Sequence, residues 1–334
     1  MLEGLLDPVE AGQDLSKLAD ILIKTMTTEV MRDFQNTAGL IKDGTFLVLA
    51  LGGYGAKALT YTSDLDLVFL YDCPKDSMST GEQRELSAQQ YYSRFAQRLI
   101  SALTILTGEG RLFEIDMRLR PSGRAGIIAV SLESFAQYQD EDAWSWEHMS
   151  LTKARIITGN EKSSTQASAL IQEILHRHHE PASLVMDIQD MRARYDKEFP
   201  DHSCWQLNTA PGGLADINWL IHYHILQLPK ENAYEAEVQS QIQAIANTNS
   251  MTQEECNNLE EAWALLFKAR SLARLLFGDA KKVPNADHST QQTLANLLHH
   301  ANFQETSRHI EDAKTQVKDL FSKYIGYPNS DLGA

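Results

Sequence analysis

The chain has 334 residues, of which 43% are apolar and 22% are charged, a composition typical of a globular protein with room for two domains. No apolar run approaches the roughly 18 residues of a membrane span, and the N-terminus lacks the basic and apolar regions of a signal peptide, so we expect a cytoplasmic protein with no membrane partner. The formal net charge of −15 argues against a nucleic-acid partner, because non-specific binding to phosphates requires a basic surface.

Two elements are expected before the first informative motif. Apolar residues spaced three and four apart, from Leu15 through Leu18 to Phe34, predict an amphipathic helix over residues 15–36. A short apolar run predicts a strand over residues 46–51. We expect the helix to pack as a flank of the domain that contains this strand.

A glycine-rich segment follows this strand, with the sequence Leu-Gly-Gly-Tyr-Gly-Ala at residues 51–56. Gly52 and Gly55 are candidates for binding a nucleotide, because backbone without a Cβ in the way can close on a phosphate group. The alternative is that these glycines are ordinary turn residues. The spacing is not Gly-x-Gly-x-x-Gly and no convincing helix follows it, which argues against a dinucleotide-binding fold.

The most informative segment, residues 62–72, reads Thr-Ser-Asp-Leu-Asp-Leu-Val-Phe-Leu-Tyr-Asp and begins a strongly apolar strand. Alternate residues on a strand point to the same side, so Asp64 and Asp66 should project together while residues 67–70 fill both faces of a buried strand. Adjacent carboxylates raise one another's pKa unless a cation neutralises them, and carboxylates with phosphate oxygens form a site suited to Mg²⁺. Ser63 belongs to the candidate nucleotide-binding set. The alternative is a strand start whose carboxylates are satisfied by turn amides.

A long helix is expected over residues 81–106, and a third strand over residues 111–120. Apolar and charged residues alternate almost perfectly along that strand. Asp116, Arg118 and Arg120 should therefore share one face.

The charged face of this strand offers a third carboxylate. Asp116 beside Asp64 and Asp66 would complete a site for two metal ions, which polarise a transferred phosphoryl group, stabilise the leaving pyrophosphate and lower the pKa of an attacking hydroxyl. Arg118 and Arg120 would neutralise the polyphosphate. The alternative is a half-exposed strand whose acids and bases pair with one another.

Residues 143–155 are expected to form a helix that places Glu147 and Arg155 on one side. Glu147 with Lys153 or Arg155 could orient phosphate groups, and we include Lys153 among the nucleotide-binding candidates. An ordinary surface ion pair one helical turn apart is the alternative. The clearest cluster of cationic residues lies in the same half of the chain as the carboxylates, which suits a small anion such as a triphosphate: Arg118, Arg120, Arg124, Lys153 and Arg155.

After about residue 160 strand signals almost vanish, so the chain as a whole is expected to be α+β, with a mixed-sheet domain followed by an all-α domain. The boundary is placed at Glu180-Pro181, giving domains 1–180 and 181–328. Asp216 lies in the first turn of a helix opened by Pro-Gly-Gly, and we expect it to interact with the helix dipole. The expected helices are 162–178, 183–198, 214–228, 235–248, 253–277, 289–303 and 304–325.

Five motifs follow one another between about residues 45 and 280. They are Gly-Gly-Tyr-Gly-Ala at 52–56, Thr-Ser-Asp-Leu-Asp-Leu-Val-Phe-Leu at 62–70, Asp-Met-Arg-Leu-Arg-Pro-Ser-Gly at 116–123, Ala-Trp-Ser-Trp-Glu-His at 143–148 with Lys-Ala-Arg at 153–155, and Gly-Gly-Leu-Ala-Asp-Ile at 212–217. Their order and spacing resemble glutamine synthetase adenylyltransferase. Of that enzyme's two homologous halves, the Arg-Pro-Ser-Gly and Trp-Glu-His segments resemble the C-terminal half, which adds AMP, better than the N-terminal half, which removes it.

The resemblance implies a nucleotidyltransferase-like mixed-sheet domain followed by a helical bundle, with Mg²⁺ as cofactor and ATP as substrate. It carries the catalytic and metal-binding roles onto Asp64, Asp66 and Asp116. The implied reaction is attack of a tyrosine hydroxyl of glutamine synthetase on the α-phosphorus of ATP, with release of pyrophosphate, which regulates nitrogen assimilation. Glutamine synthetase is then the protein substrate, and a nitrogen-signalling regulatory protein and the other half of the enzyme are further implied partners.

The sequence departs from the family pattern in the phosphate-contacting loop. The family's lysine is replaced by Gly53 and its second glycine by Ala56, while a glutamate expected nearby is Ala58. Asn218 occupies a position that is often acidic. These changes keep two alternatives open: a deadenylylating half that works by phosphorolysis, and a catalytically weakened nucleotide-binding or regulatory module.

Overall fold

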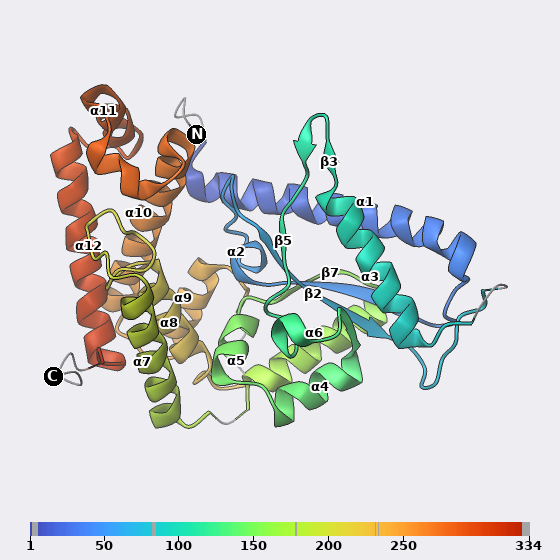
Figure 1. Ribbon diagram of the computed structural model, residues 1–334. Helices are drawn as coiled ribbons and strands as arrows, with labels where there is room; N and C mark the ends of the chain where they lie inside the picture. The colour runs from blue at the N-terminus through green and yellow to red at the C-terminus, as the bar shows by residue number, and fades with distance from the viewer. Residues whose placement is uncertain (2–5, 82–84, 178, 231, 233, 329–334) are drawn as a thin grey trace. The chain divides into compact units, whose positions relative to one another are not determined.

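The computed structural model describes residues 1, 6–81, 85–177, 179–230, 232 and 234–328 and has an α+β architecture with a small mixed sheet (Figure 1). The chain divides into two compact units. Asp14–Leu59 and Ser63–Arg177 form the first, called here the sheet unit; Met1–Gln13, Thr60–Thr62 and His178–Ala334 form the second, called the helical unit. A search of the described residues finds no helix with the length and apolar character of a transmembrane span.

The central strand of the sheet is β2 (Leu65–Asp72), which lies within one residue of the strand that the apolar run predicts over residues 64–71. It pairs antiparallel with β1 (Thr45–Ala50), and β1 pairs antiparallel with β7 (Arg155–Thr158). On its other side β2 pairs in parallel with two short strands, β5 (Ile115–Asp116) and β6 (Ala129–Ser131). A separate hairpin joins β3 (Leu106–Thr107) to β4 (Gly110–Arg111).

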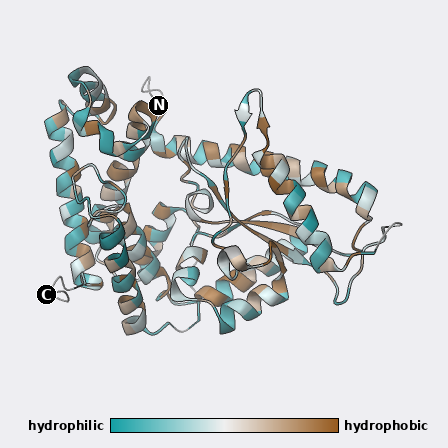
Figure 2. Ribbon diagram, in the orientation of Figure 1, coloured by the Kyte–Doolittle hydropathy of each residue, from teal (hydrophilic) through white to brown (hydrophobic). Residues whose placement is uncertain are grey.

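Helices cover both faces of this sheet, which explains the unbroken apolar runs of β1 and β2 (Figures 1 and 2). On one face Phe46 and Phe69 meet Phe95 of α3, with the Phe46 and Phe95 ring centroids 4.7 Å apart. On the other face Leu49 and Leu70 are fully buried beneath α4 and α6. The helices of the sheet unit are α1 (Pro8–Ala38, which begins in the helical unit), α2 (Gly52–Gly55), α3 (Ala88–Thr104), α4 (Leu132–Glu141), α5 (Ser145–Leu151) and α6 (Glu161–Leu175).

The described part of the helical unit from residue 179 onward contains helices and no strands, as the sequence predicts. The helix predicted over 253–277 is confirmed at both ends, because its caps are explicit. Thr252 and Glu255 form a reciprocal capping box, and Gly278 ends the helix in a left-handed conformation with φ of 76°. The helices are α7 (Pro181–Glu198), α8 (Leu214–Ile225), α9 (Val238–Asn247), α10 (Gln253–Phe277), α11 (His288–Leu297) and α12 (Phe303–Tyr324).

Several expected elements are wrong in extent. The helix predicted over 81–106 is shorter, because Ser87 caps it and α3 begins at Ala88, and two elements near the carboxylates also differ. The ten-residue strand predicted over 111–120 is reduced to Ile115–Asp116 in the sheet, because the chain turns at once: the Arg120 amide donates to the Met117 carbonyl and the Gly123 amide to the Arg120 carbonyl. The helix predicted over 143–155 ends at Leu151, and β7 begins at Arg155. The β-branched residues that follow it pair with β1, which outweighs the helical spacing.

Candidate active site

The candidate site is built where the glycine segment meets the start of β2. Gly52 has a φ of 54°, and a Cβ at this position would lie 2.1 Å from Oδ2 of Asp66. The Leu51 amide donates to the Asp66 carbonyl at 3.0 Å, which holds the segment against the strand. Only glycine combines this backbone conformation with so close an approach to a carboxylate.

The sheet register places Asp116 directly beside Asp66. β2 and β5 run in parallel with Leu65 opposite Ile115 and Asp66 opposite Asp116, and the Leu65 amide donates to the Glu114 carbonyl at 2.9 Å. Asp64 lies one residue before β2 and is exposed. The residues predicted to supply the three carboxylates therefore lie at one end of β2.

Electrostatics in this group are unfavourable for the central carboxylate. The pKa of Asp66 is raised to about 6, first by burial and then by the nearby charges of Asp116 and Asp64. Arg118 and Lys153 act in the opposite direction and lower it. Asp66 thus carries its charge in a setting that does not fully compensate it.

Arg118 pairs with Asp116. Its backbone amide donates to Oδ1 of Asp116 at 2.8 Å and its Nε to Oδ2 at 2.6 Å, and Nη2 completes an ion pair with the same carboxylate. The Arg118 side chain remains 67% exposed, whereas that of Asp116 is 13% exposed. An exposed arginine can leave such a pair at little energetic cost, since surface ion pairs contribute about 0 to 1 kcal/mol.

The donor set fits a hard divalent cation. Carboxylate oxygens are the preferred ligands of Mg²⁺, and the raised pKa of Asp66 means that a bound cation would stabilise its ionised form. The described residues contain no group of three or more His, Cys, Asp or Glu already arranged around one metal position. In this structure the positive charge beside Asp116 is the guanidinium of Arg118.

The remaining predicted nucleotide-binding residues differ in their surroundings. Arg120 donates to the carbonyls of Met117 and Gly126, at 2.9 and 3.3 Å, and so holds the turn after β5. Lys153 is buried, and a Cβ on Gly55 would lie 2.0 Å from its carbonyl oxygen, so glycine is required at position 55. Ser63 is half-buried just before Asp64, and the Arg124 side chain lies outside the described part of the chain.

A half-buried ion pair supports the backbone of the glycine segment. Arg155 pairs with Asp20 of α1 through Nη1 to Oδ2 at 2.9 Å and Nη2 to Oδ1 at 3.1 Å. The same guanidinium donates to the carbonyls of Gly55 at 2.8 Å and Tyr54 at 3.1 Å. The expectation that Arg155 pairs with Glu147 or faces phosphate is wrong, because 135 residues separate Arg155 from its partner and no local spacing reveals the pair.

Glu147 also has a structural role in place of the two roles considered for it. Its carboxylate accepts hydrogen bonds from the Tyr138 hydroxyl at 2.9 Å and from the Trp144 amide at 3.0 Å. The second bond caps the start of α5. Glu147 is buried, so it forms no surface pair with Lys153.

Asp216, expected only to interact with a helix dipole, is the centre of a buried network in the helical unit. Arg192 donates to its Oδ1 at 2.8 Å, and Oδ2 accepts from the Gly212 amide and the Tyr327 hydroxyl, both at 2.6 Å. Arg192 also contacts Asp196, at 2.8 Å. The Gly-Gly-Leu-Ala-Asp motif therefore anchors helices α7 and α8 and the segment after α12.

Comparison with protein families finds two matches. The family described as glutamate-ammonia ligase adenylyltransferase matches residues 1–170, and the family described as GlnD PII-uridylyltransferase matches residues 186–325. The first match contains the glycine segment and all three candidate carboxylates. The second falls within the helical unit.

Similar curated proteins carry the name bifunctional glutamine synthetase adenylyltransferase/adenylyl-removing enzyme. Those of Bradyrhizobium diazoefficiens and Rhodopseudomonas palustris strain HaA2 are each 32% identical, over 325 and 330 residues, and that of Xanthobacter autotrophicus is 33% identical over 326 residues. The alignments cover 96%, 98% and 96% of this chain, but only 32%, 33% and 33% of the relatives. The chain spans about a third of the length of the curated relatives that it matches.

Proposed function

Because the chain belongs to the glutamate-ammonia ligase adenylyltransferase family, we propose that it is a metal-dependent adenylyltransferase that moves AMP from ATP to a tyrosine hydroxyl of glutamine synthetase. In this reaction a bond forms between the tyrosyl oxygen and the α-phosphorus, the bond from the α-phosphorus to the bridging oxygen breaks, and pyrophosphate leaves. Residues 1–180 would form the nucleotidyltransferase-like domain, and residues 181–328 the helical bundle.

One observation carries the proposal: a partly buried carboxylate, Asp66, lies in register with Asp116 and against the backbone of Gly52. Burial and the charges of Asp116 and Asp64 raise the pKa of Asp66 to about 6, so like charges surround this carboxylate where a structural carboxylate has hydrogen-bond donors and a cation. Perturbed carboxylates beside a glycine turn favour phosphoryl chemistry over a plain strand start. Without a cation, the same arrangement is only destabilising.

Each candidate residue has a role in this proposal. Asp64, Asp66 and Asp116 would hold Mg²⁺, which when bound supplies charge stabilisation to the α-phosphate and to the leaving pyrophosphate. Gly52 and Gly55, with Ser63, would let the backbone approach the phosphates. Arg120, Lys153 and Arg118 would neutralise the polyphosphate. Arg118 would first have to leave its ion pair with Asp116.

The proposed partners follow from the same assignment. Glutamine synthetase would be the protein substrate, with a nitrogen-signalling regulatory protein and the other half of the enzyme as further partners. We propose the AMP-adding direction because the segments at 120–123 and 146–148 resemble the C-terminal half of the enzyme better than the N-terminal half.

A weakened nucleotide-binding module is the second candidate, and the glycine segment favours it. Gly53 stands where the family has lysine, and Ala58 where a glutamate is expected, so two charged groups are missing near the phosphates. The ion pair of Arg118 with Asp116 also has to open before a metal can use that carboxylate. A module would bind Mg·ATP and transfer nothing.

Incorporation of AMP from α-labelled ATP into glutamine synthetase, with Mg²⁺ present, tests the proposal. We expect the parent chain to transfer AMP and Gly53→Lys to transfer it at least several-fold faster. A Cβ at residue 53 would lie 3.4 Å from the Ala58 carbonyl oxygen, which is an ordinary contact, so lysine fits there without strain.

Ser101→Lys, which adds the same charge at an exposed position of α3, is the matched control and should leave the rate unchanged. Binding of Mg·ATP without incorporation in the parent chain or in Gly53→Lys would establish the module instead. Phosphate-dependent release of AMP from adenylylated glutamine synthetase would indicate the removing direction.

A further inference from the structure

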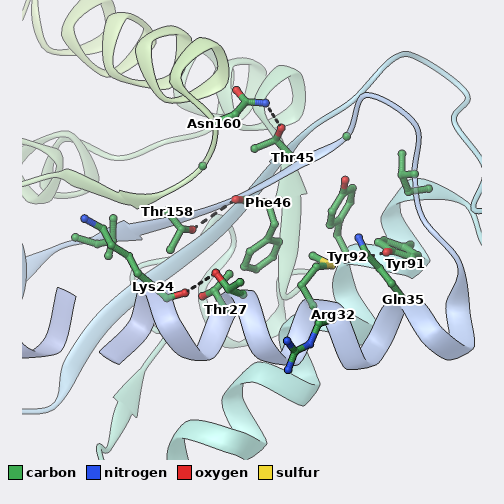
Figure 3. Close-up of a pocket in the computed structure, with 16 residues that line it drawn as sticks. Lys24, Thr27, Arg32, Gln35, Thr45, Phe46, Tyr91, Tyr92, Thr158 and Asn160 are labelled. Carbon is green, nitrogen blue, oxygen red and sulfur yellow. Dashed lines mark hydrogen bonds between the residues drawn. The ribbon is translucent and has the colours of Figure 1, made fainter. Parts of the chain in front are cut away.

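A cavity of about 660 Å³ lies inside the sheet unit, at the opposite end of β1 from the carboxylates (Figure 3). Thr45 and Phe46 line it, whereas Ala50 at the other end of the strand leads into the glycine segment. Leu51 lies five positions after Phe46, and five residue steps along a strand span about 17 Å. The cavity is thus separate from the candidate active site, and its volume is typical of pockets that hold small molecules, about 300 to 1,000 Å³.

The inner wall of the cavity is apolar and aromatic. Phe46, Tyr92 and Ile157 are all buried and come from β1, α3 and β7. Met31 of α1 adds a flexible apolar surface. Such a wall would pack against the hydrocarbon or ring of an organic ligand.

The α1 side of the cavity is polar. Thr27 is 9% exposed, and within the described part of the chain its buried Oγ1 has no hydrogen-bond partner. A buried hydroxyl without a partner is unfavourable by about 1 to 3 kcal/mol. Protein atoms cover Oγ1, so a polar group of a ligand would relieve this cost after the Thr27 side chain rotates toward the cavity. Lys24, three residues before Thr27 on α1, and Thr158 of β7 also line the cavity, and Figure 3 shows the Thr158 hydroxyl directed to the Phe46 carbonyl.

The charge of the lining is positive. Lys24 and Arg32 of α1 line the cavity, and no carboxylate does. Arg32 pairs with Glu29, while no ion pair of Lys24 occurs among the described residues. In a chain of net charge −15, the exposed ammonium group of Lys24 at the rim of a cavity with an apolar inner wall favours an anionic ligand at this place.

We propose that this cavity binds a small organic anion with an apolar body. The apolar part would pack against Phe46, Tyr92 and Ile157, and the anionic group would lie between Lys24 and the Thr27 hydroxyl. This assignment uses only the cavity and its lining and does not depend on the adenylyltransferase reaction.

A ligand in this cavity could also change the position of the glycine segment. This extension of the proposal rests on the proposed function. Lys24 lies one helical turn after Asp20 on α1, and Thr158 lies three residues after Arg155 on β7. Asp20 and Arg155 form the ion pair that holds the carbonyls of Gly55 and Tyr54. A ligand that changes the spacing of α1 and β7 therefore acts directly on the support of the proposed phosphate-binding segment.

Titration of the chain with 8-anilinonaphthalene-1-sulfonate, which has an aromatic body and an anionic group, tests the site. We expect saturable binding of one probe per chain with a rise in fluorescence. Lys24→Glu should weaken the binding at least five-fold, and Thr28→Trp, which puts a large ring at an exposed cavity-lining position, should weaken it as strongly.

Lys17→Glu is the matched control, because Lys17 is an exposed lysine of α1 that does not line the cavity. Circular dichroism verifies that each variant is folded. Binding that both cavity variants leave within two-fold of the parent, or the absence of saturable binding, would overturn the site.

Calorimetric titration with Mg·ATP, with and without saturating probe, tests the regulatory extension. We expect the probe to change the dissociation constant of Mg·ATP at least three-fold, and Asp20→Asn to bind the probe but lose this change. An unchanged constant in the parent chain overturns the extension and leaves the binding site standing. Absence of Mg·ATP binding in the parent counts against the proposed function and the extension, whereas the probe site is judged by fluorescence alone.

Discussion

Both units of this protein place an aspartate against a Gly-Gly segment, and they treat its charge in opposite ways. In the helical unit, Asp216 is fully buried and accepts hydrogen bonds from Arg192, the Gly212 amide and the Tyr327 hydroxyl. In the sheet unit, Asp66 lies against Gly52 with other carboxylates as its neighbours.

The contrast separates a carboxylate that stabilises the fold from one that does not. Every oxygen of Asp216 has a donor, which is the condition under which a buried charge is tolerated. Burial raises the pKa of both carboxylates, but the charges of Asp116 and Asp64 add to this effect at Asp66, whereas the charge facing Asp216 is the cation of Arg192. Unfavourable charge that persists in a folded chain is typical of a functional site, and in our proposal the function is the binding of a cation with a nucleotide.

The largest expected effect lies in the helical unit. Arg192→Ala would leave Asp216 buried without its cation, and we expect the free energy of unfolding to fall by about 3 to 5 kcal/mol. Urea unfolding followed by tryptophan fluorescence measures it, since Trp219 lies beside Arg192, whose guanidinium is 5.6 Å from the ring centroid. Arg194→Ala, at an exposed position two residues along the same helix, should change it by less than about 0.5 kcal/mol. A loss below 1 kcal/mol in Arg192→Ala would remove the contrast between the units.

The next effect is stabilisation of the parent chain by its proposed ligands. Mg·ATP at 100 times its dissociation constant should stabilise the folded state by about 2.7 kcal/mol, seen as a rise in melting temperature that needs both Mg²⁺ and ATP. The double variant Asp64→Asn/Asp66→Asn should show no rise, because amides cannot supply the negative charge that holds the metal. An equal rise in parent and double variant would place the nucleotide elsewhere.

The smallest effect is a pH-dependent gain of stability in Asp66→Asn. The pKa of Asp66 in the folded chain, about 6, lies above the ordinary value of 3.8, so the folded state binds more protons between these values and the stability of the parent falls as pH rises through that window. The penalty is complete above pH 6 and absent below about pH 4. Without metal, Asp66→Asn should therefore be more stable than the parent by about 1 to 2 kcal/mol at pH 8 and equal to it at pH 4, as measured by urea unfolding. A variant less stable than the parent at pH 8 would mean that Asp66 is compensated after all.

The elements with strong apolar patterns could be predicted from sequence, because the spacing of their apolar residues shows which side chains are buried. Strand β2 was expected within one residue, from its continuous apolar run, and helix α10 was expected with the bounds that the structure has. The buried face of α1 differs from the predicted one by one residue: Leu18 is 52% exposed, while Ala19 and Ile23 are fully buried. Two neighbouring faces of a helix can have similar apolar spacing one residue apart. Which of them is buried depends on how the helix packs on the sheet.

The surroundings of the candidate site depended on contacts that sequence spacing does not report. The alternation of residues 111–120 is typical of a strand, yet hydrogen bonds in the turn after Met117 end it after two residues. The partner of Arg155 is Asp20, on a different element, and the partners of Asp216 include Tyr327, 111 residues away. Pairs so distant in sequence form only through the tertiary fold, so local periodicity could not have identified them.

The central claim is that AMP transfer requires the carboxylates at the start of β2. Comparing two variants of that strand tests it most directly. Asp66→Asn and Asp72→Asn make the same chemical change at opposite ends of β2, and asparagine at 72 can still accept the hydrogen bond from the Ser163 hydroxyl. Incorporation of AMP from α-labelled ATP into glutamine synthetase should be abolished in Asp66→Asn and remain at the parental rate in Asp72→Asn, with both proteins folded. Transfer at the parental rate by Asp66→Asn would contradict the claim.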